Sequence, residues 1–427
     1  MVLNYIWIGF FLVAFVFSLS AGLFTGDWSG FPGMRDAVEK FAKLGFEIAL
    51  GLTAVMTLWL GIMKVGEKGG AVAILARFVG PLFRRLFPGV PDDHPAMGSI
   101  LMNFSANMLG LDNAATPLGL KAMRDLQELN EEKDRASDAM IMFLVLNTSG
   151  LTVIPVSVMA LRAASGAASP SDIFVPILLT TACSSLAGLI LVSLIQKINL
   201  LRPVVFAYLG GLITLLGGFA YWVTRFPNAP TEAELAAGAV IPPHTIESVT
   251  DMVGAVIIVG VIVGFVALAA WKRIDVFKTF IDGAKEGFQT AVMIIPYLVA
   301  MLVAIGVFRA SGAMGMIVNG IAKVVAACGF DTGFVEALPT ALMKPLSGGG
   351  ARGMAVEAMA THGADSFIGK LACTFQGSTE TTFYTLAVYF GAIGITRTRY
   401  AAGAGLFADF TAMLAAIFFA YLFFGGA

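Results

Sequence analysis

Long apolar runs alternate with short polar segments along most of this 427-residue chain. A helix needs about 20 mainly apolar residues to cross the hydrocarbon core of a bilayer. We therefore predict a membrane-spanning helix wherever an apolar run reaches that length. These runs cover residues 3–23, 46–64, 138–163, 171–196, 204–223, 251–271, 286–308, 366–395 and 401–424.

Other segments mix charged and apolar residues at helical spacing, which is typical of helices that lie at the membrane interface. Such segments run over residues 35–43, 71–86 and 276–285. The stretches 92–123 and 332–358 are apolar but interrupted by Gly, Pro and polar residues. Because irregular backbone at membrane depth is tolerated only inside protein or along a cavity, we interpret both stretches as re-entrant hairpins.

Composition supports a membrane protein. Hydrophobic residues make up 58% of the chain and charged residues 13%, whereas about 25% of a typical soluble domain is charged. We therefore expect an all-α polytopic protein whose surroundings are the lipid bilayer. The net charge of -1 gives no reason to expect nucleic-acid binding.

The two parts of the chain resemble each other at an offset of 242 residues. Residues 42–46 (AKLGF) correspond to residues 284–288 (AKEGF), and Gly70-Ala71 corresponds to Gly312-Ala313. A repeat of this kind predicts two related halves. We assign them to residues 1–200 and 251–427, joined by a linking helix and an outer loop in 201–250.

The distribution of Lys and Arg predicts that the halves are inverted in the membrane. Loop 124–137 carries three basic residues, whereas its counterpart near 359–365 carries no Lys or Arg. The loop 224–250 is acidic, with Glu232, Glu234 and Glu247. We expect a cytoplasmic N-terminus and a C-terminus outside.

The first hairpin and the segment after it carry polar residues where apolar ones are expected. Amides and hydroxyls both donate and accept hydrogen bonds, which suits a polar solute or a cation. The alternative is that they only satisfy backbone groups that the broken helices leave free. The candidates are Asn103, Ser105, Asn107, Asp112, Asn113, Thr116, Asn147, Thr148 and Ser149.

The second half has a matching set. Charges within a membrane mark functional sites by default, although Lys344 or Arg352 could instead extend to the interface. The bare N–H groups of Gly348 to Gly350 suit an anionic group. Glu380 and Asp112 are the candidate residues for coupling to H⁺ or Na⁺. The alternative for Glu380 is a static ion pair with Lys344 or Arg352. The candidates are Lys344, Ser347, Gly349, Arg352, Gln376, Ser378, Thr379 and Glu380.

Signals for other chemistry are missing from the sequence. It contains no P-loop motif and no recognisable nucleophile–base arrangement, so we do not expect an ATP-driven pump or an enzyme. His94, His244 and His362 show no ligand spacing. We therefore expect no metal site and no cofactor other than a possible coupling ion.

Several of these segments resemble a known family. Residues 107–123 are similar to the signature of A-type spore maturation proteins, and residues 344–353 and 376–382 to that of the B type. The chain thus resembles a fusion of both, within the nucleoside-recognition, or Gate, group. That group is similar to the core of concentrative nucleoside transporters and to the membrane part of ferrous-iron transporters.

The resemblance implies a fold and a place for the site. We expect two hairpins and two broken helices, a homo-oligomer, and location in the bacterial inner membrane. The solute would bind between the hairpin tips and the unwound helices, where residues 103–117, 147–149, 344–352 and 376–382 meet.

The favoured hypothesis is a secondary transporter that works by alternating access. Its substrate would be a small polar or zwitterionic solute, either an amino acid or a nucleoside-like molecule, moved in either direction. Two alternatives stay open, namely a non-transporting membrane scaffold or regulator and a metal-ion permease.

Overall fold

The computed structural model describes residues 2–110, 112–223, 225–227 and 245–425, and every regular element in this part is a helix. Glu232 and Glu234 of the predicted acidic loop lie outside the described residues. Seven helices in the described part are long and apolar enough to cross a membrane. The chain is therefore a multi-pass, all-α membrane protein, as predicted.

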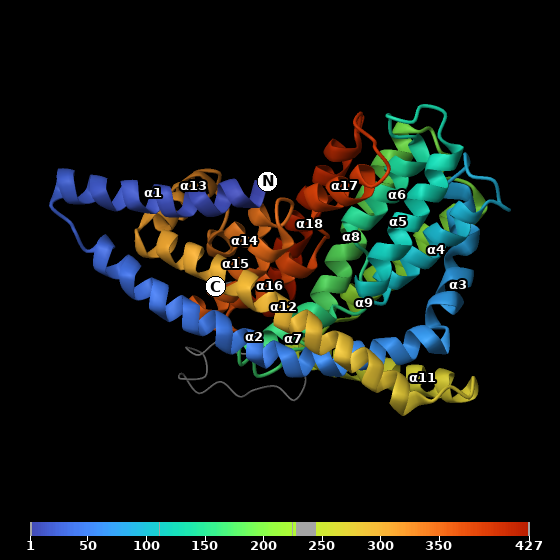
Figure 1. Cartoon of the computed structure of the whole chain (residues 1–427), viewed down its shortest axis with the longest axis horizontal. Coiled ribbons are helices and arrows are strands. Elements are labelled where there is room, and N and C mark those ends of the chain that lie inside the picture. The colour runs from blue at the N-terminus through green and yellow to red at the C-terminus, as the bar shows by residue number, and fades with distance from the viewer. Residues whose placement is uncertain (1, 111, 224, 228–244, 426–427) are drawn as a thin grey trace.

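The described helices are distributed over both predicted halves of the chain (Figure 1). In the first half they are α1 (Val2–Thr25), α2 (Gly30–Gly69), α3 (Ala71–Leu86), α4 (Pro95–Met108), α5 (Asp112–Leu129), α6 (Asp138–Ser149), α7 (Val156–Ala164) and α8 (Phe174–Ile195). The linking helix is α9 (Pro203–Val223). The second half comprises α11 (Ile246–Trp271), α12 (Val276–Ala310), α13 (Ala313–Ala327), the short η1 (Val335–Ala337), α14 (Leu338–Met343), α15 (Gly348–His362), α16 (Phe367–Gly377), α17 (Thr382–Gly391) and α18 (Ala401–Phe424).

Two of the predicted interface helices do not exist as separate elements. Residues 35–43 are part of the 40-residue α2, and residues 276–285 are part of the 35-residue α12. The charged residues at these junctions, such as Lys43, Lys285 and Glu286, are good helix formers, so the helix continues through them. Residues 71–86 do form a helix of their own, α3.

The apolar runs 138–163 and 366–395 are each divided into two short helices. The first run forms α6 and α7 with a break at 150–155, and the second forms α16 and α17 with a break at 378–381. The length of each run had suggested a continuous spanning helix, and that prediction is wrong for both runs. The family resemblance had implied two broken helices, and the structure has a break in each of these runs.

The antiparallel pair of α2 and α12 makes the most extensive helix–helix contact in the fold (Figure 1). Gly45 lies against Val299, and Gly287 lies against Met56 and Thr57. At an offset of 242 these two contacts are equivalent. Small residues let helix backbones approach closely in membranes, and these two glycines allow the close contact between α2 and α12.

We expect Gly287→Ala to destabilise the protein. A β-carbon at this position would lie 2.5 Å from the carbonyl oxygen of Met56 and 2.9 Å from the Cα of Thr57, so the two helices would have to separate. Overpacking of this kind costs about 1–3 kcal/mol. Gly320→Ala on α13 is the matched control, because nothing lies within 4 Å of its added methyl group. Thermal unfolding in detergent should show a lower midpoint only for Gly287→Ala, and equal midpoints would contradict the close approach.

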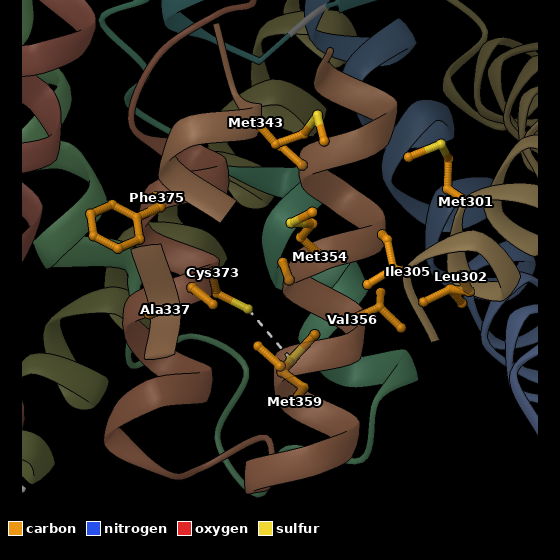
Figure 2. Packing of buried hydrophobic residues seen from close by; sticks show 14 of the residues in the cluster. Met301, Leu302, Ile305, Ala337, Met343, Met354, Val356, Met359, Cys373 and Phe375 are labelled. Atoms are coloured by element: carbon orange, nitrogen blue, oxygen red, sulfur yellow. Dashed lines mark hydrogen bonds between the residues drawn. The ribbon is translucent and has the colours of Figure 1, made fainter. Parts of the chain in front are cut away.

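The core of the second half forms where α15 packs between α12 and α16. Figure 2 shows Met354 and Met359 of α15 between Met301 of α12 and Cys373 of α16. The Sγ of Cys373 lies 3.4 Å from the Sδ of Met359. This core fixes the position of α15, whose N-terminus carries the predicted glycine motif.

Both predicted hairpins form compact helical units. In the first, α4 packs against α5, and the Nδ2 of Asn103 donates to the carbonyl oxygen of Ala115 at 2.7 Å. In the second, η1 and α14 lead into α15. That these units enter and leave the membrane from one side stays a prediction.

Two sets of ion pairs join the halves at opposite ends of the broken helices. In the last turn of α7, Arg162 contacts Asp365 of the second half at 3.0 Å and Asp172 of its own half at 2.9 Å, and its side chain is fully buried. Beyond α17, Arg397 contacts Asp134 at 2.7 Å, and both side chains are more than half exposed. The Arg397 guanidinium lowers the pKa of Asp134 by donating hydrogen bonds to its carboxylate.

Candidate functional site

A cavity of about 250 Å³ lies where the two helix breaks and the two hairpins meet. It joins the four segments that the sequence analysis had singled out. The predicted residues that line it are Asn107, Thr116, Asn147, Lys344, Arg352, Gln376, Thr379 and Glu380.

The first half contributes a connected set of amides. The Nδ2 of Asn107, on the first hairpin, donates to the Oδ1 of Asn147 at the end of α6, at 2.8 Å. The hydroxyl of Tyr389 on α17 donates to the same oxygen at 3.5 Å. The Nδ2 of Asn147 in turn donates to the carbonyl oxygen of Phe143 at 2.9 Å. Asn147 is thus held in one orientation by the first hairpin, its own helix and the second half.

The second half contributes a helix N-terminus and charged side chains. The hydroxyl of Ser347 accepts from the backbone N–H of Gly350 at 3.0 Å and so begins α15. The Nε2 of Gln376 donates to the carbonyl oxygen of Gly348 at 3.4 Å. The Oε1 of Gln376 is buried and has no hydrogen-bond partner among the described residues, so it is available to a solute donor.

The two helix breaks touch each other directly. The backbone N–H of Glu380, in the second break, donates to the carbonyl oxygen of Thr148, at the end of α6, at 2.8 Å. Gly150 follows α6 with a left-handed φ of 54° and lies against Glu380. A side chain would be strained at this φ. The glycine therefore allows α6 to end where the second break approaches it.

A second cavity, of about 480 Å³, adjoins the first and shares Arg352, Glu380 and Tyr384 with it. The side chain of Glu380 is exposed, whereas Lys344 is buried. Both signs of charge therefore line the first cavity. Lys344 and Arg352 are the cationic residues, and Glu380 is the anionic one.

Other predicted residues do not line the first cavity. Asn103, Ser105, Thr148, Ser149 and Ser378 are buried behind it. Ser347 and Gly349 line the second cavity instead. Asp112 and Asn113 stand at the start of α5, and their side chains lie outside the described part of the structure.

Sequence reasoning missed several lining residues. Tyr384, Thr385 and Tyr389 of α17 line the cavity, as do Thr152 and Ser157 near the first break. Tyr and Thr are common in apolar helices, so nothing in the sequence marked them. Asp409 was also missed. It is buried next to the second break, and its position as the single charged residue of 401–424 was a usable signal.

The fold and the cavity define a multi-pass membrane protein with one polar site between two hairpins and two broken helices. The sequence profile of the Gate family, described as nucleoside recognition, matches residues 49–165 and 291–396, which together form just over half of the chain. The chain belongs to the Gate, or nucleoside-recognition, family. One matched segment falls in each half.

Two curated relatives support the resemblance to both spore maturation types. Spore maturation protein A of Bacillus subtilis (strain 168) is 42% identical over 188 residues, which are 44% of this chain and 92% of that protein. Spore maturation protein B of the same organism is 44% identical over 167 residues, which are 39% of this chain and 92% of that protein. This is consistent with a fusion of the two types. No solved structure matches the chain significantly.

Proposed function

We propose that this protein is a secondary transporter of a small polar or zwitterionic solute, with an amino acid favoured over a nucleoside-like molecule. The observation that carries the proposal is the cavity lined by polar motifs from both halves. Paired interrupted helices that meet at a shared site are typical of secondary transporters. The membrane-helical fold and the Gate family membership support the same reading.

The charges around the cavity favour a zwitterion. Lys344 and Arg352 can receive a carboxylate, and Glu380 can receive an ammonium group. The N-terminus of α15, which carries Gly348, also favours an anionic group. The cavity is smaller than the roughly 300–1,000 Å³ typical of sites for drug-sized ligands, which suits a small solute.

The contacts between the halves support alternating access. The cavity is lined by the middle of each broken run, and one set of ion pairs between the halves lies at each end. Opening one set at a time would expose the cavity to one side of the membrane. We propose that the protein works in the bacterial inner membrane, with its N-terminus in the cytoplasm and its C-terminus outside, as a homo-oligomer. Transport in either direction, coupled to H⁺ or Na⁺, is compatible with this arrangement.

The alternatives gain less support. A scaffold predicts that the polar clusters pair with each other and leave no cavity, whereas a lined cavity is present. A metal-ion permease would need a metal-binding group along its pathway. The described part of the chain contains no group of three or more His, Cys, Asp or Glu side chains that could hold a metal ion.

A thermal-shift screen of the purified protein tests the proposal. The panel holds amino acids, nucleosides and divalent cations, each at two pH values with and without Na⁺. A ligand at 100 times its dissociation constant stabilises the native state by about 2.7 kcal/mol, so we expect amino acids to raise the unfolding temperature. Asn107→Ala should weaken this effect, because it removes a lining amide that fixes Asn147. Stabilisation by nucleosides or cations alone would overturn the amino-acid assignment, and no stabilisation by any compound would favour the scaffold.

A further inference from the structure

A carboxylate lies buried in the middle of the spanning helix α18. Asp409 is 8% exposed. Its Oδ2 accepts a hydrogen bond from the hydroxyl of Thr382 at 2.5 Å, and Thr379 also hydrogen-bonds its side chain. The other oxygen, Oδ1, is buried and has no hydrogen-bond partner in the described part of the chain. Half of the carboxylate is therefore unsatisfied.

An unsatisfied carboxylate inside a membrane protein requires an explanation. Burying an ionised carboxylate without full pairing is so unfavourable that such groups usually become neutral. Ionisable residues at membrane depth commonly serve as proton carriers or ion sites. The half-satisfied carboxylate of Asp409 is therefore a group at which a proton would bind.

The position of Asp409 links it to the moving parts of the proposed transporter. Thr379 belongs to the second helix break and lines the cavity, and Thr382 begins α17. Gly405, one turn before Asp409, lies close to both Thr382 and Thr148. The hydroxyl of Thr148 is likewise buried without a described partner. Asp409 thus lies directly behind the point where the breaks of the two halves meet.

Among the described charged side chains, Lys344 is the one that acts on the Asp409 carboxylate. Lys344, which lines the cavity, acts electrostatically on Asp409. The elements packed against α18 are α8, α6, α16, α17 and α11. Their other titratable side chains include Asp138, paired with Arg399; Lys370, paired with Asp172; Asp251, hydrogen-bonded to Ser169 and Ser171; Cys183; Cys373; Tyr384; and Tyr389.

We propose that Asp409 is the proton-binding residue that couples solute movement to the pH gradient. This inference rests on the proposed transport function. A proton from cavity water reaches the Thr379 hydroxyl, which passes its own proton to Asp409. One O–H bond forms on the carboxylate, which becomes a neutral acid. The same bond breaks when the cavity faces the other side and the proton leaves by the same route.

A proton fits this site better than a metal cation. Hard cations need several oxygen ligands arranged around a space of suitable size. Asp409 lines neither of the two cavities at the site, and a proton needs no such space. Sodium binding is therefore an outcome for the experiment to exclude.

Infrared spectroscopy of the purified protein during a pH titration tests the assignment without any solute. We expect a protonated-carboxyl band that titrates in the wild type, is lost in Asp409→Asn and moves in Asp409→Glu. Asp251→Asn is the matched control, because Asp251 lies on the neighbouring spanning helix α11 and also accepts from two hydroxyls. This control should keep the band.

Three results would overturn the assignment. The first is a wild type without the band, and the second is a band that persists in Asp409→Asn. The third is a midpoint that moves when choline replaces Na⁺, since that would show a competing sodium ion. If Asp409→Asn does not fold, Thr382→Val serves instead, because it removes a hydrogen bond to Asp409 and should shift the midpoint. An unchanged midpoint in Thr382→Val would count against the proposal.

Proteoliposomes separate this proposal from the proposed function. With an amino acid that stabilises the wild type, we expect a pH gradient to drive accumulation. Asp409→Asn should lose this accumulation but keep exchange of labelled for unlabelled solute, because Asp409 does not line the cavity. Exchange by the wild type with no response to the gradient would overturn the coupling proposal alone. A wild type that binds no solute would overturn the transport function, while the infrared titration would still decide whether Asp409 binds a proton.

Discussion

Replacing Arg162 with methionine is expected to lower the free energy of unfolding by about 3 kcal/mol. Breaking a buried ion pair by removing one partner costs roughly 3–5 kcal/mol. We expect the lower end of that range because Asp172 keeps Lys370 as a partner at 3.2 Å. The Arg162 guanidinium also donates to the carbonyl oxygens of Ala364 and Ser169, and both would lose this donor.

A double variant distinguishes charge from packing. Arg162→Met combined with Asp365→Asn removes one charge of each sign and leaves the Asp172–Lys370 pair intact. Part of the lost stability should return, as measured by denaturant unfolding in detergent. Arg77→Met, at an exposed position on α3, is the control and should change little. If Arg162→Met unfolds at the same denaturant concentration as this control, the buried contact does not hold the halves together.

The second large effect concerns solute affinity. Glu380→Gln should weaken amino-acid binding by about 10- to 150-fold, since hydrogen bonds to charged groups contribute about 1.5–3 kcal/mol. The same variant should leave the affinity for the matching carboxylic acid, which lacks the amino group, nearly unchanged. Lys344→Met should show the reverse preference, losing affinity for amino acids but not for the matching amines. Isothermal titration calorimetry measures both affinities.

Exposed residues of the same types provide the controls. Glu39→Gln on α2 and Lys323→Met on α13 change the same charges away from the cavity and should leave binding unchanged. Equal losses for acids, amines and amino acids in Glu380→Gln would indicate a general distortion of the site. That result would contradict the assigned orientation of the solute.

Much of the fold could be predicted because its physical signals are local. Continuous apolar runs predicted α1, α8, α9, α11 and α18. The two breaks were expected from the family resemblance. The lengths of α2 and α12 were not predicted, because charged residues at helical spacing are equally compatible with a short interface helix and with the end of a longer one.

The site was predicted in its segments more than in its individual residues. Asn107, Asn147 and Glu380 line the cavity as expected, but Ser105 and Ser378 of the same motifs are buried behind it. Helical periodicity is lost where a helix breaks, so the sequence does not show which side chains of a motif face inward. Asp409 escaped notice because it lies outside every glycine-rich or repeated motif.

The lengths of α2 and α12 have a consequence for the surrounding lipid. At about 1.5 Å per residue, the 40 residues of α2 extend for roughly 60 Å, about twice the thickness of a bilayer's hydrocarbon core. Neither helix can therefore stand upright within the membrane, and the pair must tilt steeply or project beyond it. Because α7 packs on α2 and α15 packs on α12, a change in bilayer thickness would alter the inclination of the helices that carry the cavity.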